Sequence, residues 1–403
     1  MISVEEAEKL ISDNLDSLPT ETLLLEQSLG RTLREPLLAD RELPPFNRAT
    51  LDGIAIDSSA FSLGKHSFPI VGIAAAGTAP KTLHDSNTCF EIMTGAPLPG
   101  GTDAVIRVED ISIQDGTATV STTTEVKPGL GVHPAGSDCR QGQILLKPGR
   151  TITAKETAIA ASIGKTKVVV SKLPTINIVS TGNELVEISD TPLPHQIRRS
   201  NDSTLAAALI SSGFSNTSKH HLPDDKAIVE NSVATLLQNS DVLVIAGGIS
   251  KGKYDYLPNA LKENGAEMVF QWVSQRPGKP LWFGIYERGG KRIPIFALPG
   301  NPVSSFTCLH RYVIPALAKM AQTHEAPQTH IKLKQSYSFK ALLSLFLPVS
   351  VATDNDGTLW ATPLPFNTSG DFISVAQTSG FIQLPKDQVD FEVGSVHRYF
   401  PWS

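Results

Sequence analysis

Cysteine is scarce in this chain of 403 residues, and the cysteines present are not grouped. Cys89, Cys139 and Cys308 are odd in number and form no Cys-x-x-Cys pair. A disulfide framework and a thiolate cage for a metal are therefore excluded, and the low count fits a reducing compartment. The first six residues also lack the basic and apolar regions of a signal peptide, so we expect a cytoplasmic protein.

Long apolar runs and dense basic tracts are missing as well. The apolar run at residues 341–352 contains Pro348 and is shorter than the roughly 20 residues that a membrane-spanning helix needs. Lysine and arginine total 35 against 40 acidic residues, a net charge of -5. A surface that binds nucleic acid would carry clustered basic residues. We therefore expect neither a membrane nor a nucleic-acid partner.

Three common catalytic motifs are also absent from the sequence. It has no Gly-x-Ser-x-Gly, no Walker A lysine loop and no Gly-x-Gly-x-x-Gly. These absences disfavour a serine hydrolase, a P-loop NTPase and a dinucleotide-dependent dehydrogenase. The composition is that of a globular protein, with 40% hydrophobic and 19% charged residues. The length is too great for one ordinary core, so we expect two to four domains.

The amino-terminal half changes pattern twice. Ser3 and Glu6 have the spacing of a capping box before an amphipathic stretch, which predicts a helix that ends before Pro19. The segment from there to about residue 43 has a moderately helical pattern. Short β-rich runs separated by glycine, proline, asparagine and aspartate then predict a small β domain. We expect this domain, residues 46–138, to be inserted into a mixed domain made of residues 1–45 and 139–172.

The carboxyl-terminal half begins with regular alternation of strand-like and helix-like segments. This alternation, in residues 173–326, predicts a doubly wound parallel α/β sheet that binds its ligand at the carboxyl ends of the strands. Short strands and turns in residues 327–403 predict a second β domain. The predicted fold class is therefore a multidomain α/β and β protein.

Two strand-end loops of the α/β segment have the character of anion cradles. In residues 298–305, Gly300 would permit close backbone approach and Pro302 suits a first helical turn, where free amides favour negative charge. Residues 247–252 add glycines, the Ser250 hydroxyl and Lys251, which can surround a phosphate. A Gly-Gly pair after a strand is also a common tight turn, so a phosphate-binding loop and a plain turn both stay open for this segment.

Carboxylates near these loops are open to two interpretations. Asp255 suits Mg²⁺ or the amino-terminal cap of a helix equally well. The adjacent Asp224 and Asp225 could support a metal, but a helix cap is the more probable interpretation of that pair. Glu184, in the Thr-Gly-Asn-Glu sequence that follows the first α/β strand, would place a carboxylate at the ligand-binding edge.

Three other segments carry weaker signals. Arg276 and Lys279 flank a rigid Pro-Gly turn and could grip a tetrahedral oxyanion, although a solvated basic turn is favoured when the segment is taken alone. Asp52, before a glycine, is first of all a turn signal. Thr94 with Gly95 could offer a hydroxyl and an amide, or merely a turn. The histidines at positions 220 and 221 lack a third ligand at a recognisable spacing and are interpreted as ordinary strand-end residues.

Taken in order, these motifs resemble the molybdenum insertase family, which includes MoeA and the E domain of gephyrin-type proteins. The resemblance covers nearly the whole chain, and several matching blocks are six or more residues long. Its matching segments are Asp-Gly at 52–53, residues 93–99 with 103–105, residues 180–185, 197–201, 247–250 through Asp255, 277–280 and 298–305.

The resemblance implies an elongated homodimer that inserts molybdenum from molybdate into adenylylated molybdopterin and releases AMP with the help of Mg²⁺. The resemblance assigns proton transfer and metal binding to Asp52, Asp255, Asp224 and Glu184, with Asp52 and Asp255 as Mg²⁺ ligands. Arg276 and Lys279 would bind molybdate. Residues carried over to substrate binding are Thr94, Gly95, Thr181, Gly182, Asn183, Ser200, Asn201, Gly247, Gly248, Ser250, Gly252, Pro277, Gly278, Gly300, Asn301, Pro302 and Ser304.

The sequence departs from the family pattern at Ala49, Ile54, Lys251 and Arg276, and residues 340–349 lack an arginine common in the family. These departures could mark a paralogue with reduced activity that serves as a non-catalytic dimeric scaffold or pterin-binding module. A second alternative is the enzyme of the preceding adenylylation step, because such enzymes share this kind of α/β domain. The amino-terminal and carboxyl-terminal β regions argue against it, since a lone α/β domain would suffice for that reaction.

Overall fold

The computed structural model describes residues 1–248, 256–340, 342–364 and 370–402. The chain forms two compact units. The first contains residues 1–34, 148–153 and 168–403, and the second contains residues 35–147 and 154–167. Within the described part of the chain, no helix combines the length and the apolar character that crossing a membrane requires.

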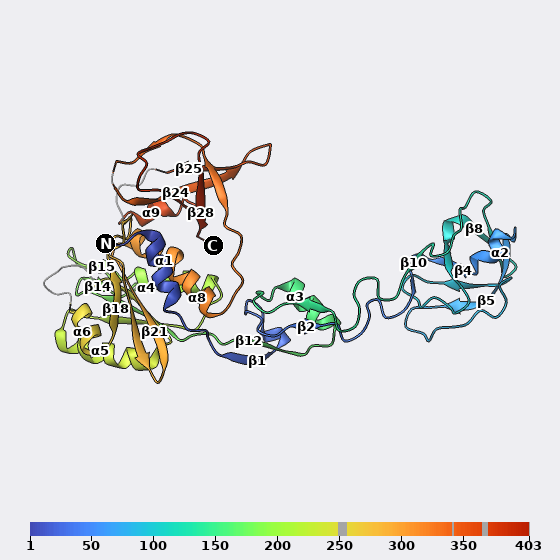
Figure 1. The fold of residues 1–403 in the computed structure, drawn as a ribbon, viewed down its shortest axis with the longest axis horizontal. Coiled ribbons are helices and arrows are strands. Elements are labelled where there is room, and N and C mark those ends of the chain that lie inside the picture. The colour runs from blue at the N-terminus through green and yellow to red at the C-terminus, as the bar shows by residue number, and fades with distance from the viewer. Residues whose placement is uncertain (249–255, 341, 365–369, 403) are drawn as a thin grey trace. The chain divides into compact units, whose positions relative to one another are not determined.

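The second unit is built on a six-stranded β-sheet with the order β7-β4-β6-β5-β9-β8 (Figure 1). Its core includes Ile54, Phe68 and Ile106. Gly53 begins β4 so close to β7 that an added Cβ would lie 1.8 Å from the carbonyl oxygen of Ile106. The strands are β4 (Gly53–Ile56), β5 (Ser67–Ala74), β6 (Cys89–Ile92), β7 (Ala104–Arg107), β8 (Ile111–Gln114) and β9 (Thr117–Val120), with helix α2 (Ser58–Ser62) beside them.

Smaller elements complete this unit. They are the antiparallel pair β2 (Leu37–Leu38) and β11 (Ile144–Leu146), the antiparallel pair β3 (Arg48–Ala49) and β10 (Val132–His133), and helix α3 (Ala154–Ser162). A short 3-10 turn, η2 (Val108–Asp110), follows β7.

The prediction of helical structure in the segment before residue 43 was wrong. That segment contains strand β1 (Thr20–Leu24), a single 3-10 turn (Leu25–Gln27) and β2. In β1 the side chains alternate in exposure, and the strand pairs with β12 (Lys167–Ser171), far along the chain. Pairing with a distant strand overrides a weak local helical preference.

The first unit contains the α/β sheet, with strand order β16-β13-β17-β21-β20-β18 (Figure 1). The first four strands are mutually parallel, and β20 and β18 form an antiparallel edge. The bounds are β13 (Ile176–Thr181), β16 (Thr217–Leu222), β17 (Val242–Ala246), β18 (Glu267–Gln271), β20 (Trp282–Arg288) and β21 (Lys291–Leu298).

Helices cover both faces of this sheet. Ile178 packs with α4 (Asn201–Ser211), α1 (Val4–Asp13) and α8 (Ile314–Met320) on one face. Val179, the next residue of β13, packs with α5 (Lys226–Asn239) and α6 (Leu257–Glu263) on the other. Helix α7 (Pro302–Cys308) continues through a π-helical turn (Leu309–Val313) into α8. The predicted doubly wound α/β fold is therefore confirmed, with the two antiparallel strands as an addition.

The amino-terminal helix α1 belongs to the same core. Ser3 caps it by accepting a hydrogen bond from the Glu6 backbone N–H at 3.1 Å, as its spacing predicts. Val4, Ala7 and Ile11 are buried against the α/β sheet. The domain boundaries expected from the sequence group this helix with residues 139–172, and those boundaries stay a prediction.

The carboxyl-terminal strands form a closed β-barrel. Strands β24, β25, β22, β28 and β26 pair in that order, and β26 pairs again with β24. β19 (Gln275–Arg276), from the α/β segment, extends β24 in parallel. The remaining bounds are β22 (His330–Leu333), β23 (Tyr337–Ser338), β24 (Ser344–Thr353), β25 (Leu359–Pro363), α9 (Phe372–Val375), β26 (Gly380–Leu384), β27 (Asp390–Phe391) and β28 (Val396–Pro401).

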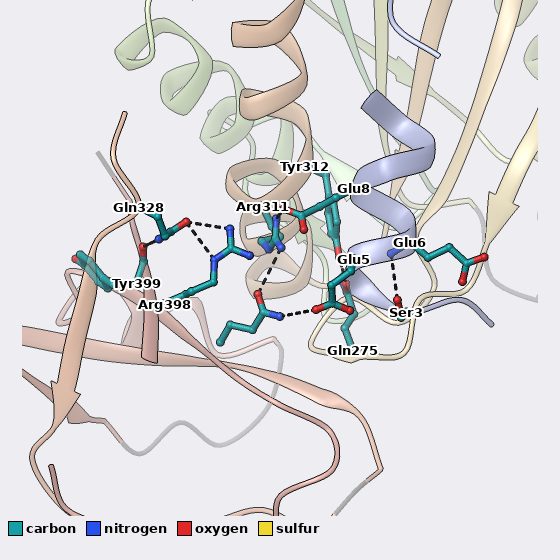
Figure 2. A network of polar contacts seen from close by, with 11 residues as sticks. Ser3, Glu5, Glu6, Glu8, Gln275, Arg311, Tyr312, Gln328, Arg398 and Tyr399 are labelled. Atoms are coloured by element: carbon teal, nitrogen blue, oxygen red, sulfur yellow. Dashed lines mark hydrogen bonds and ion pairs between the residues drawn. The ribbon is translucent and has the colours of Figure 1, made fainter. Parts of the chain in front are cut away.

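A buried arginine joins α1, the π-helical turn and the barrel, as Figure 2 shows. Arg311 is 2% exposed. Its guanidinium donates to Glu8 of α1 and to Gln383 of β26, and lies 4.7 Å from the ring centroid of Phe400 in β28. Beside it, the Tyr312 hydroxyl donates to Gln275. Polar and aromatic contacts therefore tie the barrel to the α/β sheet.

An ion pair near α1 gives a pH-dependent prediction. Asp16 accepts from the side chain and the backbone N–H of Arg292 at 2.6–2.9 Å, and these hydrogen bonds lower the pKa of its carboxyl below 3.8. Because the folded-state pKa is the lower one, the stabilisation is present above the ordinary pKa and disappears as the pH falls through the folded value. We expect Asp16→Asn to destabilise at neutral pH. Denaturant titrations at decreasing pH should show the difference between the two proteins closing, and a constant difference would contradict this origin.

Candidate functional site

A cavity of about 520 Å³ opens beyond the carboxyl ends of β13, β17 and β21. The chain runs from β13 to β16 on one side and later to β17 on the other, so this edge is the topological switch point where open α/β sheets bind ligands. Sequence-predicted residues that line the cavity are Thr181, Gly182, Glu184, Ser200, Asn201, Asp224, Gly247, Gly248, Gly300, Asn301 and Pro302. The structure therefore brings three predicted loops together.

The loop after β17 needs glycine at two positions. Gly247 and Gly248 have φ values of 101° and 70°, a region that side chains rarely adopt. A Cβ on Gly248 would also lie 2.8 Å from the Thr181 hydroxyl. At Gly300, by contrast, an added Cβ would meet only the Gly247 Cα at an ordinary 3.6 Å. The close backbone approach expected at Gly300 concerns a bound anion and stays a prediction.

The loop after β13 is fastened to the start of α5. The Asn183 backbone N–H donates to Asp224 at 3.2 Å, and the Asp224 backbone N–H donates back to Asn183 at 3.1 Å. Asp225, not Asp224, caps α5 by accepting from the Ile228 N–H. The favoured interpretation of the pair as a cap is thus right for Asp225 and wrong for Asp224, whose side chain borders the cavity.

Histidine 221 has a supporting contact that the sequence did not reveal. Its Nε2 donates to the carbonyl oxygen of Gly182 at 2.9 Å and so holds the cavity loop from behind. His220 pairs instead with Asn177, and burial lowers the pKa of its imidazole. No group of three or more metal-ligating side chains occurs among the residues that the structure describes.

Two helices begin at the cavity. Asn201 starts α4 and donates from its side-chain amide to the Gly300 carbonyl oxygen at 2.7 Å, which ties the two loops together. Pro302 is the first residue of α7. Free backbone N–H groups and the helix dipole make such starts favourable for anions. Ser304 is buried in α7 and does not line the cavity.

Two cations of the cavity wall lie at the end of the short parallel pair β14 (Leu185–Val186) and β15 (Ile197–Arg198), one as the last residue of β15 and one directly after it. Arg198 and Arg199 line the cavity. In the sequence they belong to the matching segment 197–201, and no role was predicted for either residue. The available signal was two successive arginines directly before a helix that starts beside predicted anion loops.

The predicted molybdate pair lies on a turn outside the cavity lining. Arg276 and Lys279 are both exposed, and the Arg276 guanidinium lies 5.9 Å from the Phe339 ring centroid. Only Pro280, at the end of this turn, lines the cavity. Pro277 and Gly278 are buried.

Gly278 has a packing constraint, which gives a testable prediction. A Cβ there would lie 2.4 Å from the Cys308 sulfur and 2.7 Å from the Gln275 side-chain nitrogen, at φ +86°. We expect Gly278→Ala to reduce the free energy of unfolding by about 2–4 kcal/mol, from overpacking and backbone strain together. The control is Gly357→Ala, at φ +85° with nothing within 4 Å. Equal losses in denaturant titrations would refute the packing argument.

Cys89 and Cys308 are not reactive groups. All three cysteines of the chain are buried. Burial raises the pKa of the Cys308 thiol and of the Cys89 thiol to about 12. These two residues are therefore protonated near neutral pH and are unsuited to act as nucleophiles or thiolate ligands.

The remaining predicted residues lie in the second unit or outside the described residues. Asp52 accepts hydrogen bonds from the backbone N–H of Thr94 at 2.7 Å and from its hydroxyl at 3.1 Å. Gly95, which follows, has φ +82° and turns the chain there. Nearby, His133 contacts Arg48 at 3.1 Å and Asp138 at 2.9 Å, a cluster absent from the sequence-based predictions. Ser250, Lys251, Gly252 and Asp255 lie outside the described residues.

Comparison with known families matches three consecutive regions. Residues 2–164 match the MoeA N-terminal region (domain I and II), residues 177–319 match a probable molybdopterin binding domain, and residues 331–402 match the MoeA C-terminal region (domain IV). The cavity lies in the middle region.

Relatives match over nearly the full length. A molybdopterin molybdenumtransferase from Synechocystis sp. is 39% identical over 402 residues, which cover 100% of both chains. One from Staphylococcus epidermidis is 30% identical, covering 98% of this chain and 94% of its own. A crystal structure of a molybdopterin biosynthesis MoeA protein from Pyrococcus horikoshii superimposes with a TM-score of 0.82 at 28% identity, covering 100% of this chain and 99% of the other. By sequence across all three regions and by fold, this chain belongs to the MoeA family.

Proposed function

We propose that this chain is a molybdopterin molybdenumtransferase, which inserts molybdenum from molybdate into adenylylated molybdopterin and releases AMP. The observation that carries the proposal is the switch-point cavity, bordered by glycine loops, two helix starts and two carboxylates. It lies in a chain 39% identical over its length to a molybdopterin molybdenumtransferase.

The cavity groups suit a substrate that carries phosphates. The starts of α4 and α7 offer backbone N–H donors to phosphate oxygens, and the glycine loop after β17 lets a ligand approach the backbone, although the Gly247 N–H already donates to the Leu298 carbonyl oxygen at 3.0 Å. Release of AMP requires cleavage of a phosphoanhydride, in which negative charge develops on the leaving phosphate. Fixed donors around that charge lower the barrier without reorganising. The proposed phosphate-binding groups are Gly247, Gly248, Gly300 and Asn301, which line the cavity, together with Ser250. The family resemblance also names Ser304, but its burial in α7 argues against a contact with phosphate.

Magnesium is part of the proposal because of the chemistry of the donor set. Glu184 and Asp224 border the same cavity, and Mg²⁺ prefers oxygen ligands shared with substrate phosphates. These two carboxylates would hold the ion, which when bound neutralises phosphate charge. The family resemblance adds Asp52 and Asp255. The fixed hydrogen bonds between Asp52 and Thr94 support a defined orientation for that carboxylate.

Molybdate, a substrate here, is proposed to bind Arg276 and Lys279. Support comes from their exposure on one short turn whose last residue, Pro280, reaches the cavity. Homodimer formation and a cytoplasmic location are proposed from the family resemblance. Size-exclusion chromatography with light scattering measures the oligomeric state.

One assay tests the proposal against its alternatives. The purified protein is incubated with adenylylated molybdopterin, molybdate and Mg²⁺, and AMP is followed by chromatography. AMP release with formation of active cofactor is the expected result. Pterin binding without AMP release would favour the non-catalytic scaffold, and adenylylation of molybdopterin from ATP would favour the preceding step. The full-length similarity to transferases favours neither alternative.

A further inference from the structure

Arg199 enters the cavity wall between two carboxylates. Its Nε lies 2.8 Å from an oxygen of Asp202, and its two terminal nitrogens lie 3.2 Å from the two oxygens of Glu187. The arginine side chain is 13% exposed. The guanidinium therefore has two carboxylate partners, one on each side.

The two carboxylates differ in how firmly they are held. Asp202 is fully buried in the first turn of α4, and its other oxygen accepts from the Ser203 backbone N–H at 2.7 Å. A buried charge of this kind cannot leave its partner without a large penalty. Glu187 is 58% exposed and pairs only through contacts of 3.2 Å. Solvation by water and screening by salt weaken such an exposed ion pair, so little free energy is needed to break it.

A second observation points to a ligand in the same cavity. The Ser180 hydroxyl is 1% exposed and has no hydrogen-bond partner among the described residues, although Ser180 lines the cavity. Buried hydroxyls nearly always have a hydrogen-bond partner, so an unpaired one beside a cavity is available to donate to a ligand. The eleven-residue helix α4 begins next to Arg199 and adds backbone N–H groups.

We propose that a tetrahedral oxyanion of the substrate binds Arg199 by displacing Glu187, while Asp202 keeps the guanidinium in place. Glu187 occupies the bidentate face that a phosphate or a molybdate oxyanion would use. It therefore acts as an internal competitor, and anions that bind weakly do not displace it. This inference rests on the proposed function for the identity of its ligand.

The test is a double-mutant cycle read out as binding affinity. AMP, a phosphate monoester, and molybdate are titrated separately into the full-length protein by calorimetry at low ionic strength. We expect Glu187→Gln to tighten binding of one of these probes roughly threefold to fivefold. Arg199→Gln should weaken it roughly tenfold or more. In the Arg199→Gln background the Glu187→Gln change should have no effect, because the competitor has lost its site.

Controls separate this result from folding and from general charge effects. Glu263→Gln removes an equal charge at the exposed end of α6, outside the cavity lining, and should leave both affinities unchanged. Arg199→Lys keeps a cation beside Asp202 and should fold with intermediate affinity. The probe that responds identifies the anion as phosphate ester or molybdate.

The inference is overturned if Glu187→Gln tightens neither probe, or if its effect persists without Arg199. Binding affinity is independent of turnover, so the two proposals can fail separately. If the affinity pattern is present but no AMP is released from the adenylylated substrate, the proposed reaction fails and the displacement stands. If AMP is released but the affinities do not change, the displacement fails alone.

Discussion

Replacing the two cavity carboxylates, by Glu184→Gln or Asp224→Asn, is expected to slow AMP release roughly 10²-fold or more. Each change removes one negative charge from the wall of the cavity while keeping the side chain's size. If these oxygens hold Mg²⁺ against the substrate phosphates, each substitution weakens the stabilisation of the charge that develops during phosphoanhydride cleavage. Single interactions with such a charge change the rate by factors of about 10²–10³. The measurement is the initial rate of AMP release at saturating adenylylated molybdopterin.

The chain provides a matched control next to one of these carboxylates. Asp225 neighbours Asp224 but caps α5 and does not line the cavity. Because asparagine caps helices about as well as aspartate, Asp225→Asn should keep nearly full activity and stability. Activities of Asp224→Asn and Asp225→Asn within a factor of two would contradict a catalytic role for the cavity carboxylate. Raising Mg²⁺ should partly rescue Glu184→Gln, since the second carboxylate remains.

Replacing the buried arginine of Figure 2, Arg311→Ala, is expected to lower the free energy of unfolding by about 3–5 kcal/mol. The change removes a cation that is 2% exposed, and leaves Glu8 and Gln383 without its hydrogen bonds. It also opens the space that the guanidinium fills beside Phe400. Denaturant titration followed by tryptophan fluorescence measures the loss, and binding of AMP under native conditions shows whether the cavity persists.

The matched control for this network is Arg398. It donates two hydrogen bonds to Gln328 and also lies beside Phe400, at 5.2 Å, but it is only partly buried. Partly exposed pairs contribute about 1 kcal/mol or less, so Arg398→Gln should be nearly neutral. If both substitutions cost the same, burial is not what makes Arg311 important.

Local sequence signals predicted the strand–helix alternation because each signal acts over a few residues. Ser3 caps the first helix and Pro302 begins α7, in line with their residue preferences. The loops at Thr181, Gly247 and Gly300 follow apolar strands, and parallel strands bring their carboxyl ends to one edge. Residue type and spacing were therefore sufficient to locate the cavity.

Other features depended on contacts that residue spacing does not encode. Strand β1 exists because it pairs with β12, more than a hundred residues away in sequence. The roles of the adjacent Asp224 and Asp225 separate only because one faces the Asn183 loop and the other faces the first turn of α5. The sequence alone does not distinguish these two carboxylates.

The sequence by itself determined the family, the fold class and the edge of the sheet where the ligand cavity lies, since short-range periodicity and turn chemistry carry that information. Only the tertiary structure decided how charges are distributed around the cavity. It placed Arg199 between Asp202 and Glu187, left the Arg276 and Lys279 side chains outside the lining, and buried Arg311 between helix and barrel. The strength and availability of a charge depend on its burial and its partners, and both are set by segments that meet only after folding.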